Sequence, residues 1–148
     1  MSRHPESELG QTLMLALRDF RQRLDRDLAT AGFPGLRHRH RAVFMHLEQH
    51  GASRSVDLAA AAGITPQSMM KSVHELEELG LVSRAEDPAD SRAKLVEFTP
   101  AGRRLIAQLS AATERVWAEY AALLGEKELD RTMTALKRLV QRSAEETL

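Results

Sequence analysis

Apolar side chains recur at steps of three and four residues along most of the chain, the spacing that places them on one face of an α-helix. The first stripe predicts a helix over residues 9–31 that stops at Gly32. A second helix is expected over residues 36–49, with Gly51 after its last turn. The buried face of this second helix is expected to carry Leu36, His40, Val43, Phe44 and Leu47.

A helix-turn-helix is predicted next. The segment VDLAAAAG is expected to form a short third helix that Ser53 or Ser55 caps and Gly63 ends. Thr65 can accept backbone N–H groups as the N-cap of a fourth helix, and Pro66 suits its first position because the N–H that proline lacks would have no partner there. The inner stripe of the fourth helix is Met69, Val73, Leu76 and Leu79. The outward residues near its start are Gln67, Ser68, Met70, Lys71 and His74.

The hydrophobic pattern becomes strand-like after Gly80. Residues 81–84 predict one strand, residues 87–92 a charged turn, and residues 95–98 a returning strand. A helix-turn-helix followed by such a hairpin has the order of a winged helix, in which the hairpin is the wing.

Two longer helices are predicted after the wing. Thr99 and Pro100 repeat the cap-plus-proline start and open a helix that ends at Gly125. The seam of this helix is Ile106, Leu109, Val116, Tyr120 and Leu123, and that of the last helix is Leu129, Met133, Leu136 and Val140. Neither these two helices nor the first is needed to complete a winged helix. Their apolar faces therefore predict a partner, most simply a second copy of the chain.

The expected fold is mostly α with a small β-hairpin wing. Residues 36–98 form the winged helix-turn-helix region, and residues 1–35 and 99–148 supply N- and C-terminal dimerisation helices. A length of 148 residues suits one intertwined domain of ordinary size.

Composition narrows the functional classes. The absence of cysteine excludes disulfides, thiolate metal sites and thiol-based redox sensing. No segment approaches the ~20 apolar residues that cross a bilayer, which predicts a cytoplasmic protein with no membrane partner. Because 21 basic and 21 acidic side chains cancel, nucleic-acid binding would have to come from a local cluster of basic residues.

Three segments resemble the MarR (multiple antibiotic resistance regulator) family of bacterial transcription regulators. DLAAAAGITPQSMMKSVHELEELGLVSR is similar to the recognition region of that family, DPADSR to its wing, and FTPAG to the segment that follows. The resemblance implies a homodimer whose two winged helices bind a pseudo-palindromic, inverted-repeat operator in double-stranded DNA. It further implies a repressor that a small aromatic or phenolic effector releases from DNA.

The same resemblance implies that the fourth helix enters the major groove, where Gln can pair with adenine and Lys with guanine. Arg92 matches the family's wing arginine, and the negative potential of a narrow minor groove attracts a guanidinium. Asp90 would orient Arg92 or the loop, whereas Pro88-Ala89 stands where many relatives carry an arginine. The expected DNA-binding residues are Arg54, Thr65, Gln67, Ser68, Met70, Lys71, His74, Arg84, Asp90, Arg92 and Lys94.

Candidate effector-pocket residues are His40, Phe44 and Trp117, because aromatic side chains commonly line apolar sites. His40 could instead pack in the core, and Trp117 could pack in the dimer seam. His46 and His50 have the i, i+4 spacing of a ligand pair, but a zinc site needs three or four ligands. We therefore expect no metal site and no cofactor, although this spacing alone does not decide whether His46 and His50 bind metal.

An enzyme is not expected, because the chain has no glycine-rich phosphate loop, cysteine nucleophile, His-Glu-x-x-His helix or serine elbow. The alternative from another class is a winged-helix protein-interaction module without specific DNA binding. In that hypothesis, Met69 and Met70 and the neutral overall charge serve a protein surface.

Overall fold

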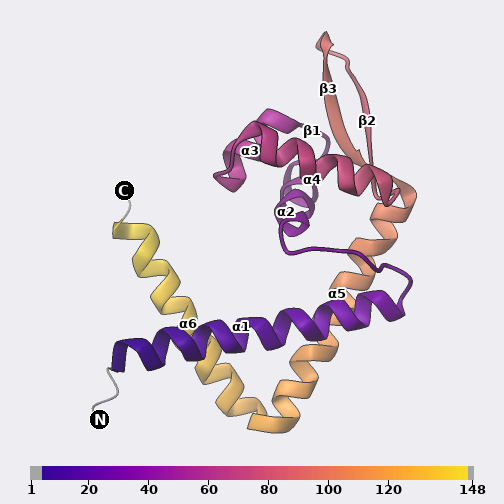
Figure 1. Cartoon of the computed structure of the whole chain (residues 1–148). Helices are drawn as coiled ribbons and strands as arrows, with labels where there is room; N and C mark the ends of the chain where they lie inside the picture. The colour runs from indigo at the N-terminus through magenta and orange to yellow at the C-terminus, as the bar shows by residue number, and fades with distance from the viewer. Residues whose placement is uncertain (1–4, 147–148) are drawn as a thin grey trace. The chain divides into compact units, whose positions relative to one another are not determined.

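The computed structural model describes residues 5–146, with side chains over residues 8–142 (Figure 1). Residues 1–4, 147 and 148, which belong to the predicted dimerisation segments, lie outside the described part. The elements are α1 (Pro5–Thr30), α2 (His40–His50), β1 (Ser53–Arg54), α3 (Ser55–Ala62), α4 (Pro66–Glu78), β2 (Val82–Asp87), β3 (Asp90–Phe98), α5 (Pro100–Leu124) and α6 (Glu126–Glu146). The predicted mostly α fold with a small wing is confirmed.

The chain divides into two compact units, residues 1–110 and residues 111–148. The first unit holds α1, the winged helix and the first part of α5, and the second holds the rest of α5 and α6. Among the described helices, none is both long enough and apolar enough to cross a membrane.

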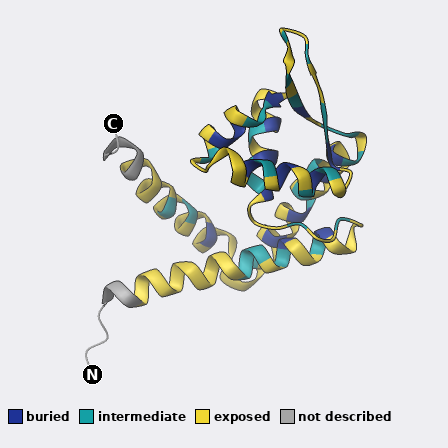
Figure 2. Cartoon of the chain, turned by 45° about the horizontal axis from the view of Figure 1, so that its top comes forward, coloured by how far each residue is buried: buried dark blue, intermediate teal, exposed yellow. Residues whose placement is uncertain are grey.

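The core of the winged helix forms where α2, α3 and α4 meet the base of the hairpin (Figures 1 and 2). Met69, Val73 and Leu76 on α4 are fully buried, as their spacing predicts. The ring of Phe44 on α2 packs against that of Phe98 at the end of β3, with centroids 6.2 Å apart. The α4 helix packs into this core through its three buried residues, and its opposite face is exposed.

Three helix boundaries differ from the prediction. The first helix begins at Pro5 rather than at residue 9. The second helix begins at His40 rather than at residue 36, because a turn precedes it in which His40 N donates to Arg37 O at 3.0 Å. Leu79 is 41% exposed rather than part of the inner stripe of α4. The reason is that α4 ends at Glu78 and the chain then turns through Gly80, whose φ of 72° favours a residue without Cβ.

The start of α3 also differs. Neither serine caps it: the N-cap position is Arg54, which makes no side-chain cap hydrogen bond. Ser53 instead lies in β1, a two-residue strand paired with Val96 of β3, and its hydroxyl donates to Gly51 O at 2.9 Å. The sheet therefore has three antiparallel strands in the order β1-β3-β2.

The wing is longer and its turn tighter than predicted. Both strands extend to the tip, so that Asp87 pairs with Asp90 and only Pro88 and Ala89 lie between them. Asp87 closes this turn because its Oδ1 accepts the N–H of Ala89 at 2.9 Å. Arg92 consequently lies on strand β3 rather than in the turn.

The predicted cap of α5 is confirmed. Thr99 Oγ1 accepts the N–H of Gly102 at 3.1 Å and donates to Gly80 O at 2.6 Å, which ties the start of α5 to the turn after α4. The predicted seam of α5 is only partly buried: Val116 is 1% exposed, whereas Leu123 is 78% exposed. The last helix, α6, likewise buries Leu129 and leaves Val140 70% exposed.

Candidate nucleic-acid interface

The outward face of α4 carries the predicted polar residues. Gln67, Ser68, Lys71 and His74 are exposed, and Met70 is half-buried. Among the described residues, no side chain forms a hydrogen bond or ion pair with Lys71. The α4 surface thus offers an amide, a hydroxyl and an ammonium group within about one helical turn, a set able to hydrogen-bond the edges of bases.

Thr65 forms the N-cap of α4. Its Oγ1 accepts the N–H of Ser68 at 3.2 Å and donates to the hydroxyl of Ser68 at 3.0 Å. The prediction of a threonine cap followed by a proline is confirmed. Because the Thr65 hydroxyl is engaged with the backbone and with Ser68, its first role is to fix where α4 starts.

The wing presents two exposed cations. The side chain of Arg92 is 94% exposed, and Lys94 is also exposed. Asp90 Oδ1 accepts the backbone N–H of Arg92 at 3.0 Å and lies 3.6 Å from Arg92 Nε. Asp90 therefore orients the strand that carries Arg92 and leaves its guanidinium largely in solvent. Lys94 lies opposite Glu86 in the register of the hairpin.

The side chain of Arg54 is hydrogen-bonded to an acid of the wing. Its Nε and a terminal nitrogen both donate to Asp87 Oδ2, at 2.9 and 2.7 Å. The hydrogen bond from Ala89, together with the Arg54 contact, holds the pKa of the Asp87 carboxyl below its usual range. Arg54 and Asp87, 33 residues apart in sequence, thus form one charged pair beside the sheet.

Arg84 on β2 faces α4. Its Nε lies 2.9 Å from Glu77 Oε1, and His74 Nδ1 lies 3.7 Å from the same oxygen. Because the Arg84 N–H does not point at this buried oxygen, the contact is an ion pair without a hydrogen bond. Two predicted DNA-binding residues, Arg84 and His74, are therefore brought together around one acid of α4.

A second acid of α4, Glu75, has a role that sequence reasoning missed. His40 and Arg39 both hydrogen-bond its carboxylate, with His40 Nε2 at 2.7 Å and Arg39 Nε at 2.9 Å. Hydrogen bonds from Arg39 and His40 lower the pKa of Glu75 to about 2. His40 Nδ1 accepts the N–H of Arg37 at 3.1 Å, so this buried ring is engaged at both nitrogens. No local sequence signal joins residues 35 or more positions apart.

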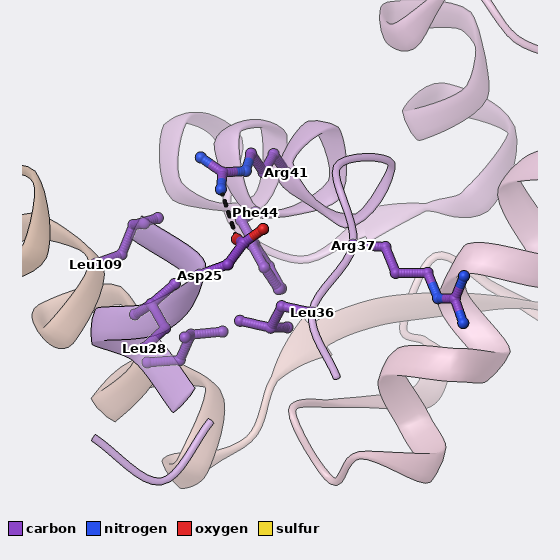
Figure 3. A pocket seen from close by; sticks show the side chains of 8 residues that line it. Asp25, Leu28, Leu36, Arg37, Arg41, Phe44 and Leu109 are labelled. Atoms are coloured by element: carbon purple, nitrogen blue, oxygen red, sulfur yellow. Dashed lines mark hydrogen bonds and ion pairs between the residues drawn. The ribbon is translucent and has the colours of Figure 1, made fainter. Parts of the chain in front are cut away.

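The candidate effector residues lie in different surroundings. Phe44 is buried and lines a cavity of about 10 Å³, which admits at most one water molecule (Figure 3). Asp25 and Arg41 close one side of it through an ion pair of 3.0 Å. His40 borders a separate hollow of about 230 Å³ beside Glu75. Trp117 belongs to the second unit and is 41% exposed there.

His46 and His50 stack on α2, with ring centroids 4.4 Å apart. In the described part of the chain, no three side chains of the metal-ligating types come together as a site.

The chain is similar to known proteins over nearly its whole length. The MarR family model matches residues 35–93. A MarR-family transcriptional regulator from Rhodococcus sp. RHA1 is 25% identical, with 93% of this chain and 96% of that chain covered and a TM-score of 0.67. A probable transcriptional regulator from Pseudomonas aeruginosa is 27% identical, with coverage of 88% and 98% and a TM-score of 0.63. A MarR family protein from Bacillus stearothermophilus is 18% identical, with coverage of 97% and 99% and a TM-score of 0.74. Residues 35–93 therefore match the MarR family of transcription regulators, and nearly the whole chain shares its fold with solved MarR-family proteins.

Proposed function

We propose that the protein is a dimeric transcription regulator that binds an inverted-repeat operator through two winged helices and acts as a repressor. The observation that carries the proposal is the exposed polar face of α4, which stands in the same compact unit as the wing that presents Arg92. In this proposal Gln67, Ser68 and Lys71 contact base edges in the major groove, and Met70 contacts a thymine methyl. Arg92 enters the flanking minor groove.

Exposed apolar residues support the dimer. In the first unit, the N-terminal half of α1 exposes Leu9, Leu13 and Leu17 by 42–60% (Figure 2). In the second unit, Leu139 and Val140 on α6 are 59% and 70% exposed. Helix faces with this much apolar surface call for a partner, and a two-fold symmetric pair of chains would cover both at once.

A small aromatic effector is the further part of the proposal. Phe44 and His40 border small sites in the first unit, and Trp117 offers an exposed ring in the second. Such a ligand would relieve repression only if it bound more tightly to a dimer whose recognition helices mismatch the half-site spacing.

The test is binding to DNA. Purified protein would be titrated with the intergenic DNA beside its own gene and with an unrelated duplex, at several salt concentrations, and its mass in solution measured by sedimentation. We expect a dimer that prefers its own DNA. Lys71→Ala should relax base preference by ~1–3 kcal/mol, whereas Arg92→Ala should weaken binding with little loss of fold. Lys127→Ala, on α6, is the matched control.

Equal affinity for both duplexes would refute the proposal and favour a protein-interaction module. Parent-like binding by both Lys71→Ala and Arg92→Ala would instead show that the site residues are wrongly assigned.

A further inference from the structure

The carboxylate of Asp87 serves two partners at once. Its Oδ2 accepts two hydrogen bonds from the Arg54 guanidinium, at 2.7 and 2.9 Å, and its Oδ1 accepts the backbone N–H of Ala89 at 2.9 Å. The Asp87 side chain is only 11% exposed, so these bonds are largely shielded from water. Charge-assisted bonds of this kind are the stronger ones in proteins.

Arg54 and Asp87 lie at different distances from the tip of the wing. Arg54 ends β1 and pairs with Leu95, at the last point where the hairpin has a third strand beside it. Leu95 in turn pairs with Ala85, and Asp87 lies two residues farther toward the tip, beyond an irregularity in the ladder. From Glu86 onward the wing is a two-stranded ribbon, and an isolated ribbon is marginally stable in water. The Arg54 side chain reaches across β3 to the end of this ribbon.

The charge of Arg54 is already matched within the protein. The hydrogen bonds and charge of Asp87 raise the pKa of Arg54, and Asp90 and Asp57 act in the same direction. A phosphate would therefore have to compete with a carboxylate for this guanidinium. Arg92, by contrast, is 94% exposed and 3.6 Å from its nearest acid.

We propose that Arg54 serves DNA binding as a positioning residue: it tethers the wing through Asp87 and Ala89, so that Arg92 is presented in one place, and does not itself contact the nucleic acid. This inference rests on the proposed DNA-binding function and adds to it a role for an acid of the wing. Asp87 then favours the binding of a polyanion, although its charge alone opposes it.

The test asks whether removing the charge of Asp87 weakens or strengthens DNA binding. Asp87→Asn keeps an oxygen for the Ala89 N–H but removes the charge that holds Arg54. Asp57→Asn is the matched control, because it removes the same charge near Arg54, and Asp57 forms no hydrogen bond with Arg54 among the described residues. The full-length variants would be titrated with the tightest duplex recovered by the parent from a randomised pool, at several salt concentrations. Hydrogen exchange of residues 85–94 would be measured without DNA.

We expect Asp87→Asn to weaken binding about tenfold, the worth of one charge-assisted hydrogen bond, and Asp57→Asn to bind as tightly as the parent or more tightly. Arg54→Ala should lose affinity to a similar extent without a change in salt slope, and the double variant should lose no more than either single variant. Exchange in residues 85–94 should be faster in Asp87→Asn than in the parent and Asp57→Asn.

Three results would overturn the tether: Asp87→Asn binding as tightly as the parent or more tightly, a salt slope reduced by about 0.9 in Arg54→Ala, or unchanged exchange in the wing. If the parent recovers no duplex from the pool, the proposed function fails, and the exchange measurement still decides whether Asp87 holds the wing.

Discussion

Replacing Gly102 with alanine probes how α5 is joined to the winged helix. Gly102 is buried in the first turn of α5, and a Cβ there would lie 2.0 Å from the backbone oxygen of Leu81 and 3.0 Å from Phe98 Cδ1. Ordinary contacts of a Cβ begin near 3.4 Å. This oxygen belongs to the backbone, so rotating a side chain cannot relieve the clash. Either α5 or the segment that leads into β2 must shift.

This shift would strain two hydrogen bonds at the start of α5. Leu81 O already accepts the N–H of Thr99 at 3.1 Å, and Thr99 Oγ1 donates to Gly80 O at 2.6 Å. Overpacking costs ~1–3 kcal/mol, each of these hydrogen bonds contributes ~1 kcal/mol, and alanine returns ~1 kcal/mol of helix propensity. We therefore expect Gly102→Ala to lower the free energy of unfolding by about 2–4 kcal/mol.

Urea unfolding followed by circular dichroism at one fixed protein concentration measures this difference. Gly10→Ala is the matched control, because it makes the same substitution in a helix where a Cβ would meet nothing within 4 Å. It should stabilise the protein by up to ~1 kcal/mol. If Gly102→Ala is as stable as the parent, the close approach of α5 to Leu81 does not exist in solution.

Two further predictions concern α4. Glu75, with its pKa held at about 2 against 4.5 for the free group, contributes stability that is fully present above pH 4.5 and is lost as the pH falls toward 2. The difference in unfolding free energy between the parent and Glu75→Gln should therefore shrink as the pH falls across that window. Unfolding curves followed by fluorescence at a series of acid pH values measure this difference, and a constant difference would contradict the assignment. Thr65→Ala should lower stability by ~1 kcal/mol, because Ser68 N loses its cap, whereas Thr65→Ser should stay near the parent in thermal melts. Equal losses in both variants would exclude a capping role.

Features decided by neighbouring residues were predictable. The cap at Thr65 needs only a hydroxyl three residues before a free N–H, and the same holds for Thr99 and Gly102. The inner stripe of α4 follows from helical spacing up to Leu76. Leu79 fell outside it because the chain leaves the helix one residue earlier than the apolar pattern does.

Features decided by distant residues were not predictable. The strand β1 exists because two residues meet β3 more than 40 positions later, and a two-residue strand leaves no periodic pattern. The partners of Arg54 and Glu75 are likewise 33 and 35 or 36 positions away. The predicted set of DNA-binding residues could therefore include Arg54 but could not identify the acid that engages it.

These distant pairs bear on how a chain of zero net charge can carry a surface for DNA. Three acidic side chains of the winged helix contact basic side chains of the same unit, which largely match their charges. The pairs are Glu75 with Arg39 and His40, Glu77 with Arg84, and Asp87 with Arg54. Lys71 and Lys94, by contrast, have no side-chain partner among the described residues, and Arg92 is almost fully exposed. Lys71, Lys94 and Arg92 are therefore cations that α4 and the wing present to solvent, with Asp90 beside Arg92 and Glu86 opposite Lys94 in the hairpin. Because few phosphates would be neutralised, the proposed interface should depend for specificity on base contacts more than on bulk charge.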